Sequence, residues 1–573
     1  MPSSSSIAAP NKLPIIPSPT PCCSARHHAN SGNNSTNSDS IQTNMKPNTA
    51  TRHGLRALLC ASAALTALPA TANVRLPKIF TDDMMLQRDM PVHVWGWADP
   101  GEAVSVTLAG KSAKTKTSAG GTWSLELPAV KTGENLELTI QGNDILTLKN
   151  VIMGDLWVCS GQSNMEMGLG GCLGAEADIK TADLPKIRRI KFNHEQAGVP
   201  ALDASVGTWQ VCTPQTAPGF TAVGFYFARD ILQKTGVPIG IIDNNWGGCN
   251  IEPWVAPEGL AMVAELKPQM TVRQEAIKTY HTTRLPKALT ELDAWIALTR
   301  KQLASGAEIT PSPVIPPHPG GEGWCGMYNA MLHPILPLPI KGALWYQGES
   351  NGGEGDTYYD KMHALIGGWR QLWKQGDFPF YFVQLASFQA VSADPAGGDG
   401  WAKVREAQTK SLTIPNTGMA VITDTVPLTE KDDIHPKNKF DVGMRLARWA
   451  LARDYGQKNL EVSGPLFKAV KIEGGKARLA FDHTGAGLMV GKKSGVAPTT
   501  EASGEKLKSF AIAGADKKWV WADAVIDGKT VTVSSPEVKE PVAVRYAFRM
   551  NPDGANLYNR DGLPASPFRT DAW

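Results

Sequence analysis

The chain has 573 residues, 42% of them hydrophobic, which suffices for roughly two to four domains with buried cores. Lys and Arg number 57 against 54 Asp and Glu, and the resulting net charge of +3 gives no support for a nucleic-acid partner. The eight cysteines have no zinc-ligand spacing, so we expect no metal site.

The N-terminal segment has the composition of a targeting sequence. Residues 1–44 are rich in Ser, Asn and Pro and are predicted to be disordered. In 45–72, basic residues precede a short apolar stretch that ends at the small residues Ala70-Thr71-Ala72, as in a secretory signal peptide. We therefore expect Met45 to be the true start, 1–44 to be an upstream mis-start, and the mature protein to be periplasmic or secreted, with no membrane association after cleavage.

Residues 74–151 are predicted to form an N-terminal β domain. The runs "VHVWGWA", "VSVTLAG", "TWSLELP" and "LELTIQG" alternate apolar and polar residues and are separated by Gly- and Pro-containing turns. The pattern is typical of a small β-sandwich. The C-terminal region, 459–573, has a similar pattern in "ARLAFDH" and "PVAVRYAF" and is predicted to be β-rich.

The middle region, 152–458, differs because its apolar runs are continuous. "LWVCS", "IGIID", "ALWYQ", "FYFVQLA" and "MAVITD" are separated in several places by helical patterns such as "AVGFYFARDILQKTG". This alternation predicts an α/β fold with a parallel sheet covered on both faces. Residues from about 256 to 317, a helical pattern followed by a Pro-rich loop, are expected to be an insertion.

Polar residues follow four of these five strands. In open α/β sheets, functional groups gather at the carboxyl ends of the strands. The residues found at those positions are Ser163, the pair Gly247 and Gly248, the group Gln347, Glu349 and Asn351, and the group Asp432, Asp433 and His435.

These residue types suit nucleophilic catalysis. A serine hydroxyl needs a base within hydrogen-bond reach, and His435 can be that base for Ser163. A carboxylate two or three residues earlier, Asp433 or Asp432, can orient the imidazole.

Attack on an ester carbonyl creates an oxyanion that requires hydrogen-bond donors. The candidates are the Ser163 N–H, an N–H of Gly247 or Gly248, and a side-chain amide of Gln347 or Asn351.

Several motifs together resemble a known family. "GQSNM", "WGG…EPW", "WYQGESN" and "DIHPKNKFDVGMRLA" are similar to segments of the sialate O-acetylesterase family, within the SGNH-type hydrolases. The similarity runs from about Leu76 to the C-terminus. It implies a three-layer αβα catalytic domain with accessory β domains, no metal or organic cofactor, and removal of O-acetyl groups from sialic acids through an acetyl-serine intermediate.

The resemblance also assigns roles to residues. It makes Ser163 the nucleophile and His435 the general base, and it gives oxyanion and pocket roles to the glycine pair and to the "QGE" segment. The D-x-x-H spacing of the superfamily favours Asp432 as the acid over Asp433. A Ser-His dyad assisted by Glu349 is the third possibility.

The sugar is less closely specified than the chemistry. The O-acetylated substrate of an acetylxylan esterase would use the same residues, whereas sialic acid has a carboxylate for which Arg405 and Arg569 are the candidate cations. A non-catalytic carbohydrate-binding protein would match the β domains and the tryptophan content, but it would not need a complete nucleophile, base and oxyanion set.

Overall fold

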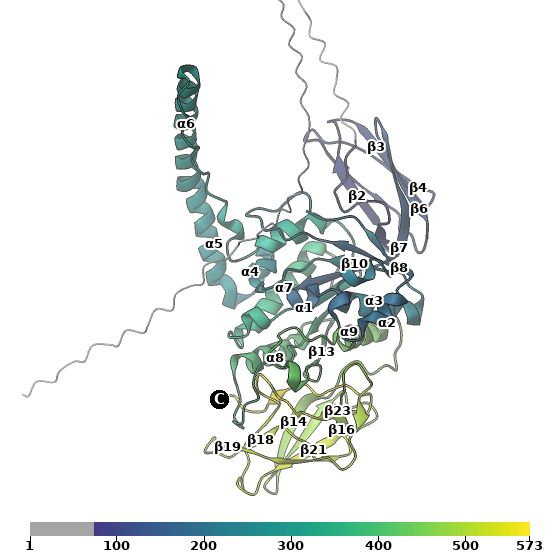
Figure 1. Ribbon diagram of the computed structural model, residues 1–573, viewed down its shortest axis with the longest axis vertical. Coiled ribbons are helices and arrows are strands. Elements are labelled where there is room, and N and C mark those ends of the chain that lie inside the picture. The colour runs from purple at the N-terminus through teal and green to yellow at the C-terminus, as the bar shows by residue number, and fades with distance from the viewer. Residues whose placement is uncertain (1–73) are drawn as a thin grey trace, which may run out of the picture. The chain divides into compact units, whose positions relative to one another are not determined.

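The computed structural model describes residues 74–573, arranged in the chain as a β region, a helix-covered central sheet and a second β region (Figure 1). The disorder predicted for 1–44 and the signal peptide predicted for 45–72 lie outside the described residues.

The central sheet has the strand order β13-β12-β11-β7-β10-β8-β9. Its strands are β7 (Ile145–Gly161), β8 (Leu184–Lys191), β9 (Gln210–Cys212), β10 (Ile239–Asp243), β11 (Gly342–Tyr346), β12 (Phe380–Val383) and β13 (Thr417–Ala420). All neighbours along this order are parallel except β9, which is antiparallel to β8. The predicted parallel sheet is therefore confirmed from β13 to β8, and the short antiparallel strand β9 at one edge makes the whole sheet mixed.

The five predicted apolar runs are confirmed as strands, whereas β8 was not predicted. Its sequence "LPKIRRIK" has four basic residues and lacks the continuous apolar character expected of a buried parallel strand. The structure accommodates this charge through partners. Arg188 donates to the backbone oxygen of Asp83 at 2.8 Å, and Arg189 donates to the carboxylate of Asp243 at 2.6 Å.

Helices cover both faces of the sheet, as the pattern predicted. One face packs against α3 (Ala222–Thr235) and α9 (Lys439–Arg453), and the other against α4 (Pro257–Met262), α7 (Thr357–Trp373) and α8 (Gly400–Lys410). Alternate side chains of β7 supply the two cores, with Leu156 in one and Trp157 in the other.

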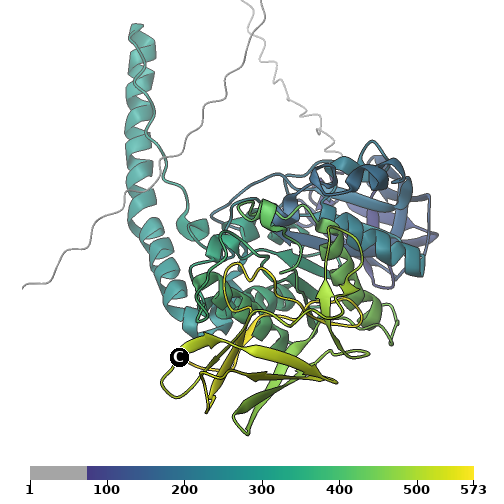
Figure 2. The ribbon, with the colours of Figure 1, turned by 60° about the horizontal axis from the view of Figure 1, so that its bottom comes forward.

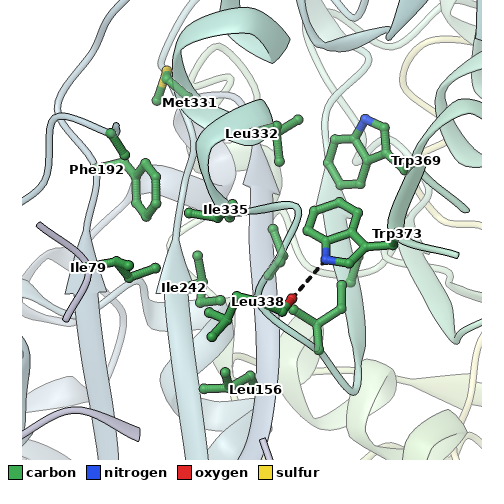
Figure 3. Close-up of a cluster of buried hydrophobic side chains, with 14 of the residues drawn as sticks. Ile79, Leu156, Phe192, Ile242, Met331, Leu332, Ile335, Leu338, Trp369 and Trp373 are labelled. Carbon is green, nitrogen blue, oxygen red and sulfur yellow. Dashed lines mark hydrogen bonds between the residues drawn. The ribbon is translucent and has the colours of Figure 1, made fainter. Parts of the chain in front are cut away.

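Figure 3 shows part of the core that contains Leu156 and that packs against α4, α7 and α8. Leu156 and Ile242, from neighbouring strands, point toward the helical segment that contains Ile335, and Trp373 of α7 donates through Nε1 to the backbone oxygen of Leu338 at 3.0 Å. The indole donor is thus satisfied within an otherwise apolar layer.

The N-terminal β region contains the predicted strands in two sheets. One sheet pairs β2 (Val92–Trp97) with β5 (Thr122–Leu127). The other joins β3 (Ala103–Leu108) and β4 (Lys111–Lys116) to β6 (Leu136–Gln141), which pairs with the first part of β7. The second part of β7 belongs to the central sheet, so the boundary predicted between 151 and 152 falls inside a strand. A short strand, β1 (Met85–Gln87), pairs with residues 152–154 of β7, where the strand passes from one sheet to the other.

The predicted insertion contains α4, α5 (Lys267–Thr279) and α6 (Leu285–Ser305), followed by the Pro-rich loop. Figures 1 and 2 both show α6 extending away from the sheet. Accordingly, Ala288 is the only buried residue of α6.

The C-terminal β region has a hydrophobic core of its own. Its strands are β14 (Leu466–Glu473), β15 (Lys476–Asp482), β16 (Leu488–Lys492), β17 (Thr500–Glu501), β18 (Phe510–Ala513), β19 (Trp519–Trp521), β20 (Asp523–Asp527), β21 (Thr530–Ser534), β22 (Ala543–Tyr546), β23 (Leu557–Asn559) and β24 (Phe568–Arg569). The two larger sheets follow the orders β14-β15-β21-β20 and β19-β18-β22-β24.

Between residues 74 and 573, no helix is both long and apolar enough to cross a bilayer. The five cysteines in this range, Cys159, Cys172, Cys212, Cys249 and Cys325, are all free thiols.

Candidate active site

The turn after β7 requires a glycine. Gly161 has φ +131, and a Cβ at this position would lie 2.1 Å from the backbone oxygen of Tyr346 on the neighbouring strand. The strand therefore ends tightly against β11, and the short helix α1 (Ser163–Glu166) begins two residues later. Ser163 is thus the first residue of a helix at the carboxyl edge of the sheet.

The structure brings the predicted nucleophile and base together. The Nε2 atom of His435 lies 2.8 Å from the Oγ atom of Ser163, although the two residues are 272 positions apart. His435 is in the loop before α9. That helix begins at Lys439, with the side chain of Asn438 accepting from the Asp441 N–H at 3.1 Å.

The carboxylate beside His435 belongs to Asp433 and not to Asp432. An Oδ1 atom of Asp433 lies 3.5 Å from Nδ1 of His435 and accepts from the His435 backbone N–H at 2.8 Å. The side chain of Asp432 is 74% exposed and pairs with Lys431. The preference for Asp432 is therefore corrected. The 3.5 Å separation is longer than a strong hydrogen bond, and the Asp433 side chain is 40% exposed.

The Glu349 carboxylate serves a different partner. It accepts from Nδ2 of Asn164 at 2.5 Å and has no hydrogen bond or ion pair with His435 among residues 74–573, so it is not placed as the acid of a Ser-His dyad. Burial raises the pKa of Glu349. The same Asn164 amide group donates to the backbone oxygen of Ile434 at 3.0 Å, and its Oδ1 accepts from Nζ of Lys439 at 2.5 Å. Lys439 is fully buried, and burial lowers its pKa to about 8.

Three of the predicted oxyanion donors are already occupied. The Gly247 N–H donates to Glu166 at 2.7 Å. The amide group of Gln347 donates to Asn351 Oδ1 at 2.7 Å and accepts from the Tyr358 hydroxyl at 2.7 Å. The Asn351 amide group donates in turn to two glutamates, Glu252 at 3.1 Å and Glu354 at 2.9 Å. Because these groups are satisfied within the protein, we correct their assignment as oxyanion donors: Gly247 ties the loop after β10 to Glu166, and Gln347 and Asn351 support the loop after β11.

Other donors remain available. Within residues 74–573, the backbone N–H groups of Ser163 and Gly248 have no hydrogen-bond partner. Gly248 is exposed and has φ +73. Gln162 accepts through Oε1 from Gln347 at 3.1 Å, which fixes its amide group, and its Nε2 has no partner in the same range.

The two arginines proposed to bind a substrate carboxylate are engaged elsewhere. Arg405 is fully buried, and its guanidinium donates to backbone oxygens, including those of Leu385 at 2.7 Å and Arg549 at 2.6 Å. Burial lowers its pKa. Arg569 donates to Glu406 at 2.8 Å. Arg405 therefore joins distant loops and does not present a cation to a ligand.

Sequence reasoning missed Asn164, Gln162 and Lys439. Asn164 and Gln162 are part of the quoted "GQSNM" motif, so a signal was present, but only the serine was given a role. Lys439 is likewise part of the quoted "DIHPKNKFDVGMRLA" motif, but it received no role, because a lysine in the first turn of an amphipathic helix is normally solvated.

Comparison with known proteins agrees with this geometry. Residues 153–280 and 325–452 match the family described as "Carbohydrate esterase, sialic acid-specific acetylesterase". A sialate O-acetylesterase from Mus musculus is 30% identical over 445 residues, which cover 70% of this chain and 77% of the mouse protein. The sialate O-acetylesterase from Homo sapiens is 29% identical over 448 residues, covering 71% and 76% of the two chains.

This chain belongs to the sialate O-acetylesterase family. Among solved structures, a carbohydrate acetylesterase from Xanthomonas citri is 36% identical with a TM-score of 0.72, and the alignment covers 87% of this chain and 100% of that one. The family relation and the α/β fold confirm the expectation of a carbohydrate O-acetylesterase, a hydrolase that acts on O-acetylated sugars. Both stretches that match the sialate O-acetylesterase family contain part of the site, with Ser163 in the first and His435 in the second.

Proposed function

We propose that the chain removes acetyl groups from O-acetylated sugars through an acetyl-serine at Ser163. The 2.8 Å contact between Nε2 of His435 and Oγ of Ser163 carries this proposal. His435 takes the hydroxyl proton while Oγ attacks the acetyl carbonyl carbon. The carbon–oxygen bond to the sugar then breaks, and His435 gives the proton to the departing sugar oxygen. Water attacks the acetyl-serine with His435 again as base, and acetate leaves.

The oxyanion would be stabilised by the donors that the protein leaves free. These are the backbone N–H groups of Ser163 and Gly248 and the Nε2 atom of Gln162, all close in sequence or space to the nucleophile. A pair or triplet of fixed donors of this kind stabilises a tetrahedral intermediate because they need no reorganisation during the reaction. Asp433 assists by stabilising the protonated imidazole at 3.5 Å.

O-acetylated sialic acid is the substrate that the family relation supports best, since the human and mouse relatives are sialate O-acetylesterases. A neutral acetylated sugar, as in acetylated xylan, is the second candidate. The burial of Arg405 and the pairing of Arg569 with Glu406 favour it, because neither guanidinium is free to bind a carboxylate. The signal-like segment 45–72 supports export, and we infer that the enzyme works in the periplasm or outside the cell.

The experiment compares Ser163→Ala with Ser350→Ala and the wild type in acetate release from O-acetylated sialic acids and from acetylated xylan. Ser350 is an exposed serine near the site, so its variant controls for the loss of a hydroxyl. Ser163→Ala should lower kcat by about a millionfold, as in coupled serine-histidine units, while Ser350→Ala should stay close to the wild type. Near-normal activity of a folded Ser163→Ala protein would refute the proposal. The preferred substrate of the wild type decides between the two sugar classes.

A further inference from the structure

A cavity of about 530 Å³ opens next to the candidate nucleophile. Gly247, one of its lining residues, is so close to the serine that a Cβ placed on it would lie 3.3 Å from Cβ of Ser163. The volume is within the range of roughly 300–1,000 Å³ that is typical of small-molecule sites. A substrate whose acetyl group reaches Ser163 therefore has room here for another part of its structure.

Two partly exposed tryptophans line this cavity and pack against the core below it, Trp246 after β10 and Trp324 a few residues after the insertion. The backbone N–H of Trp246 donates to the Gly161 oxygen at 3.0 Å, which ties the ring to the strand of the nucleophile. The imidazole of His194 stacks on Trp246, with ring centroids 4.7 Å apart and planes 7° from parallel, but His194 does not line the cavity. The aromatic surface of Trp246 is thus positioned by the protein itself.

The part of the chain that the structure describes, residues 74–573, places no cation on the lining of the cavity. No Lys, Arg or His side chain in this range contributes to it, and its one charged residue there is Glu252. That carboxylate pairs at 2.5 Å with Nζ of Lys361, which lies outside the lining and also pairs with Glu354. Gln196 and Asn250 add uncharged polar groups. A ligand carboxylate would lose its hydration here without gaining an ion pair, whereas hydroxyl groups can find hydrogen bonds.

We propose that this cavity binds an uncharged pyranose unit of the acetylated glycan. The apolar C–H face of such a ring packs on an indole, and its hydroxyls face the polar rim, which matches two tryptophans with amide side chains nearby. The assignment rests on the proposed esterase function for its link to catalysis. Trp324 lies in the segment between the two stretches that match the family, so this wall of the cavity comes from a part of the chain outside the shared catalytic sequence.

The test uses Trp324→Ala, because Trp324 has no hydrogen bond or ring contact with Ser163 or His435, and Trp521→Ala as a matched control. Trp521 is 44% exposed and belongs to β19, away from the cavity lining. Each variant is assayed with an acetylated xylo-oligosaccharide and with 4-nitrophenyl acetate, which has no sugar. Binding of the deacetylated xylo-oligosaccharide and of N-acetylneuraminic acid is measured separately by calorimetry in a Ser163→Ala background, where no turnover is needed.

Trp324→Ala should lower kcat/KM for the glycan about 10-fold or more, mainly through KM, and should weaken oligosaccharide binding to a similar extent. Hydrolysis of 4-nitrophenyl acetate should stay within about twofold of the wild type, and Trp521→Ala should change neither property. Equal losses on both esters, or unchanged oligosaccharide binding, would overturn the proposal. So would Trp324-dependent binding of N-acetylneuraminic acid that is tighter than that of the neutral sugar. Trp324-dependent sugar binding in a protein that hydrolyses neither ester would refute the esterase function and leave this site standing.

Discussion

The Asn164 side chain donates a hydrogen bond of 3.0 Å to the backbone oxygen of Ile434. Asn164 follows the nucleophile in the sequence and Ile434 precedes the base, so one amide group connects the two halves of the catalytic pair. The orientation of that amide group is fixed on both sides, by the Lys439 ammonium at Oδ1 and the Glu349 carboxylate at Nδ2. The contact between nucleophile and base is therefore supported by a buried, charged network.

Asn164→Asp should separate this positioning role from binding. The new carboxylate keeps the shape and the contact with Lys439 but repels Glu349 and cannot donate to the Ile434 oxygen. We expect kcat to fall about 100-fold, the loss associated with a displacement of about 1 Å in a reacting group, with little change in KM. Steady-state kinetics on 4-nitrophenyl acetate measure both constants, and Asn143→Asp, at an exposed turn, is the control. A variant with wild-type kcat would contradict the role given to Asn164.

Substitution of the two neighbouring aspartates should give unequal effects. Asp433→Asn removes the charge that lies 3.5 Å from the imidazole, whereas Asp432→Asn alters a side chain that is 74% exposed and paired with Lys431. We expect Asp433→Asn to lower kcat by about 10- to 100-fold, less than the roughly 10,000-fold loss for a buried triad aspartate, because water screens the exposed carboxylate. Asp432→Asn should retain wild-type kcat. A larger loss of kcat in Asp432→Asn than in Asp433→Asn would show that Asp432 is the acid, as the D-x-x-H spacing suggested.

Lys439 should make stability depend on pH in the alkaline range. Burial lowers its pKa from the ordinary 10.5 to about 8, while Glu349 and Asp433 oppose this shift. Between these values the unfolded chain holds a proton that the folded chain has lost, so this group's contribution to stability rises with pH from about 8 to 10.5. Below pH 8 its destabilising effect is complete.

The measurement compares urea unfolding midpoints of the wild type and Lys439→Met at several pH values from 7 to 10. Cysteines and tyrosines also titrate in this range, but both proteins keep them, so the difference between the two isolates the lysine. The unfolding midpoint of the wild type should rise relative to that of the variant as pH rises. If the midpoint of the wild type relative to that of Lys439→Met stays constant or falls as pH rises, Lys439 does not have a lowered pKa in the folded protein.

Sequence patterns predicted the features that depend on local periodicity. The apolar runs identified the core strands, and strand-end logic placed Ser163 and His435 in contact. The choice between the aspartates failed for a local reason that spacing does not reveal. The Asp433 side chain folds back to accept the His435 N–H, which holds that carboxylate near the ring, whereas Asp432 points to Lys431.

The remaining errors involve partners distant in the sequence. Gln347 and Asn351 follow a strand as donors should, but the Asn351 amide group donates to Glu252, and the Gln347 amide group donates to Asn351. Arg405 was assigned to the substrate because a cation was expected there. Its partners include backbone oxygens of Arg549 and Met550, which only folding brings near Arg405. Every residue has a backbone carbonyl, so the sequence does not show which one will accept from an arginine.

The strand β7 has a consequence for engineering. Its first residues complete a sheet of the N-terminal β region, and its last residue is the glycine before the nucleophile turn. A shortened enzyme that begins at the central sheet would start in mid-strand and would expose the hydrogen-bonding edge at Ile152, Met153 and Gly154 that β1 now covers. To exchange the N-terminal β region among related esterases, the chain would have to be joined within β7, which both regions share. Within residues 74–573, no linker separates the two regions at that junction.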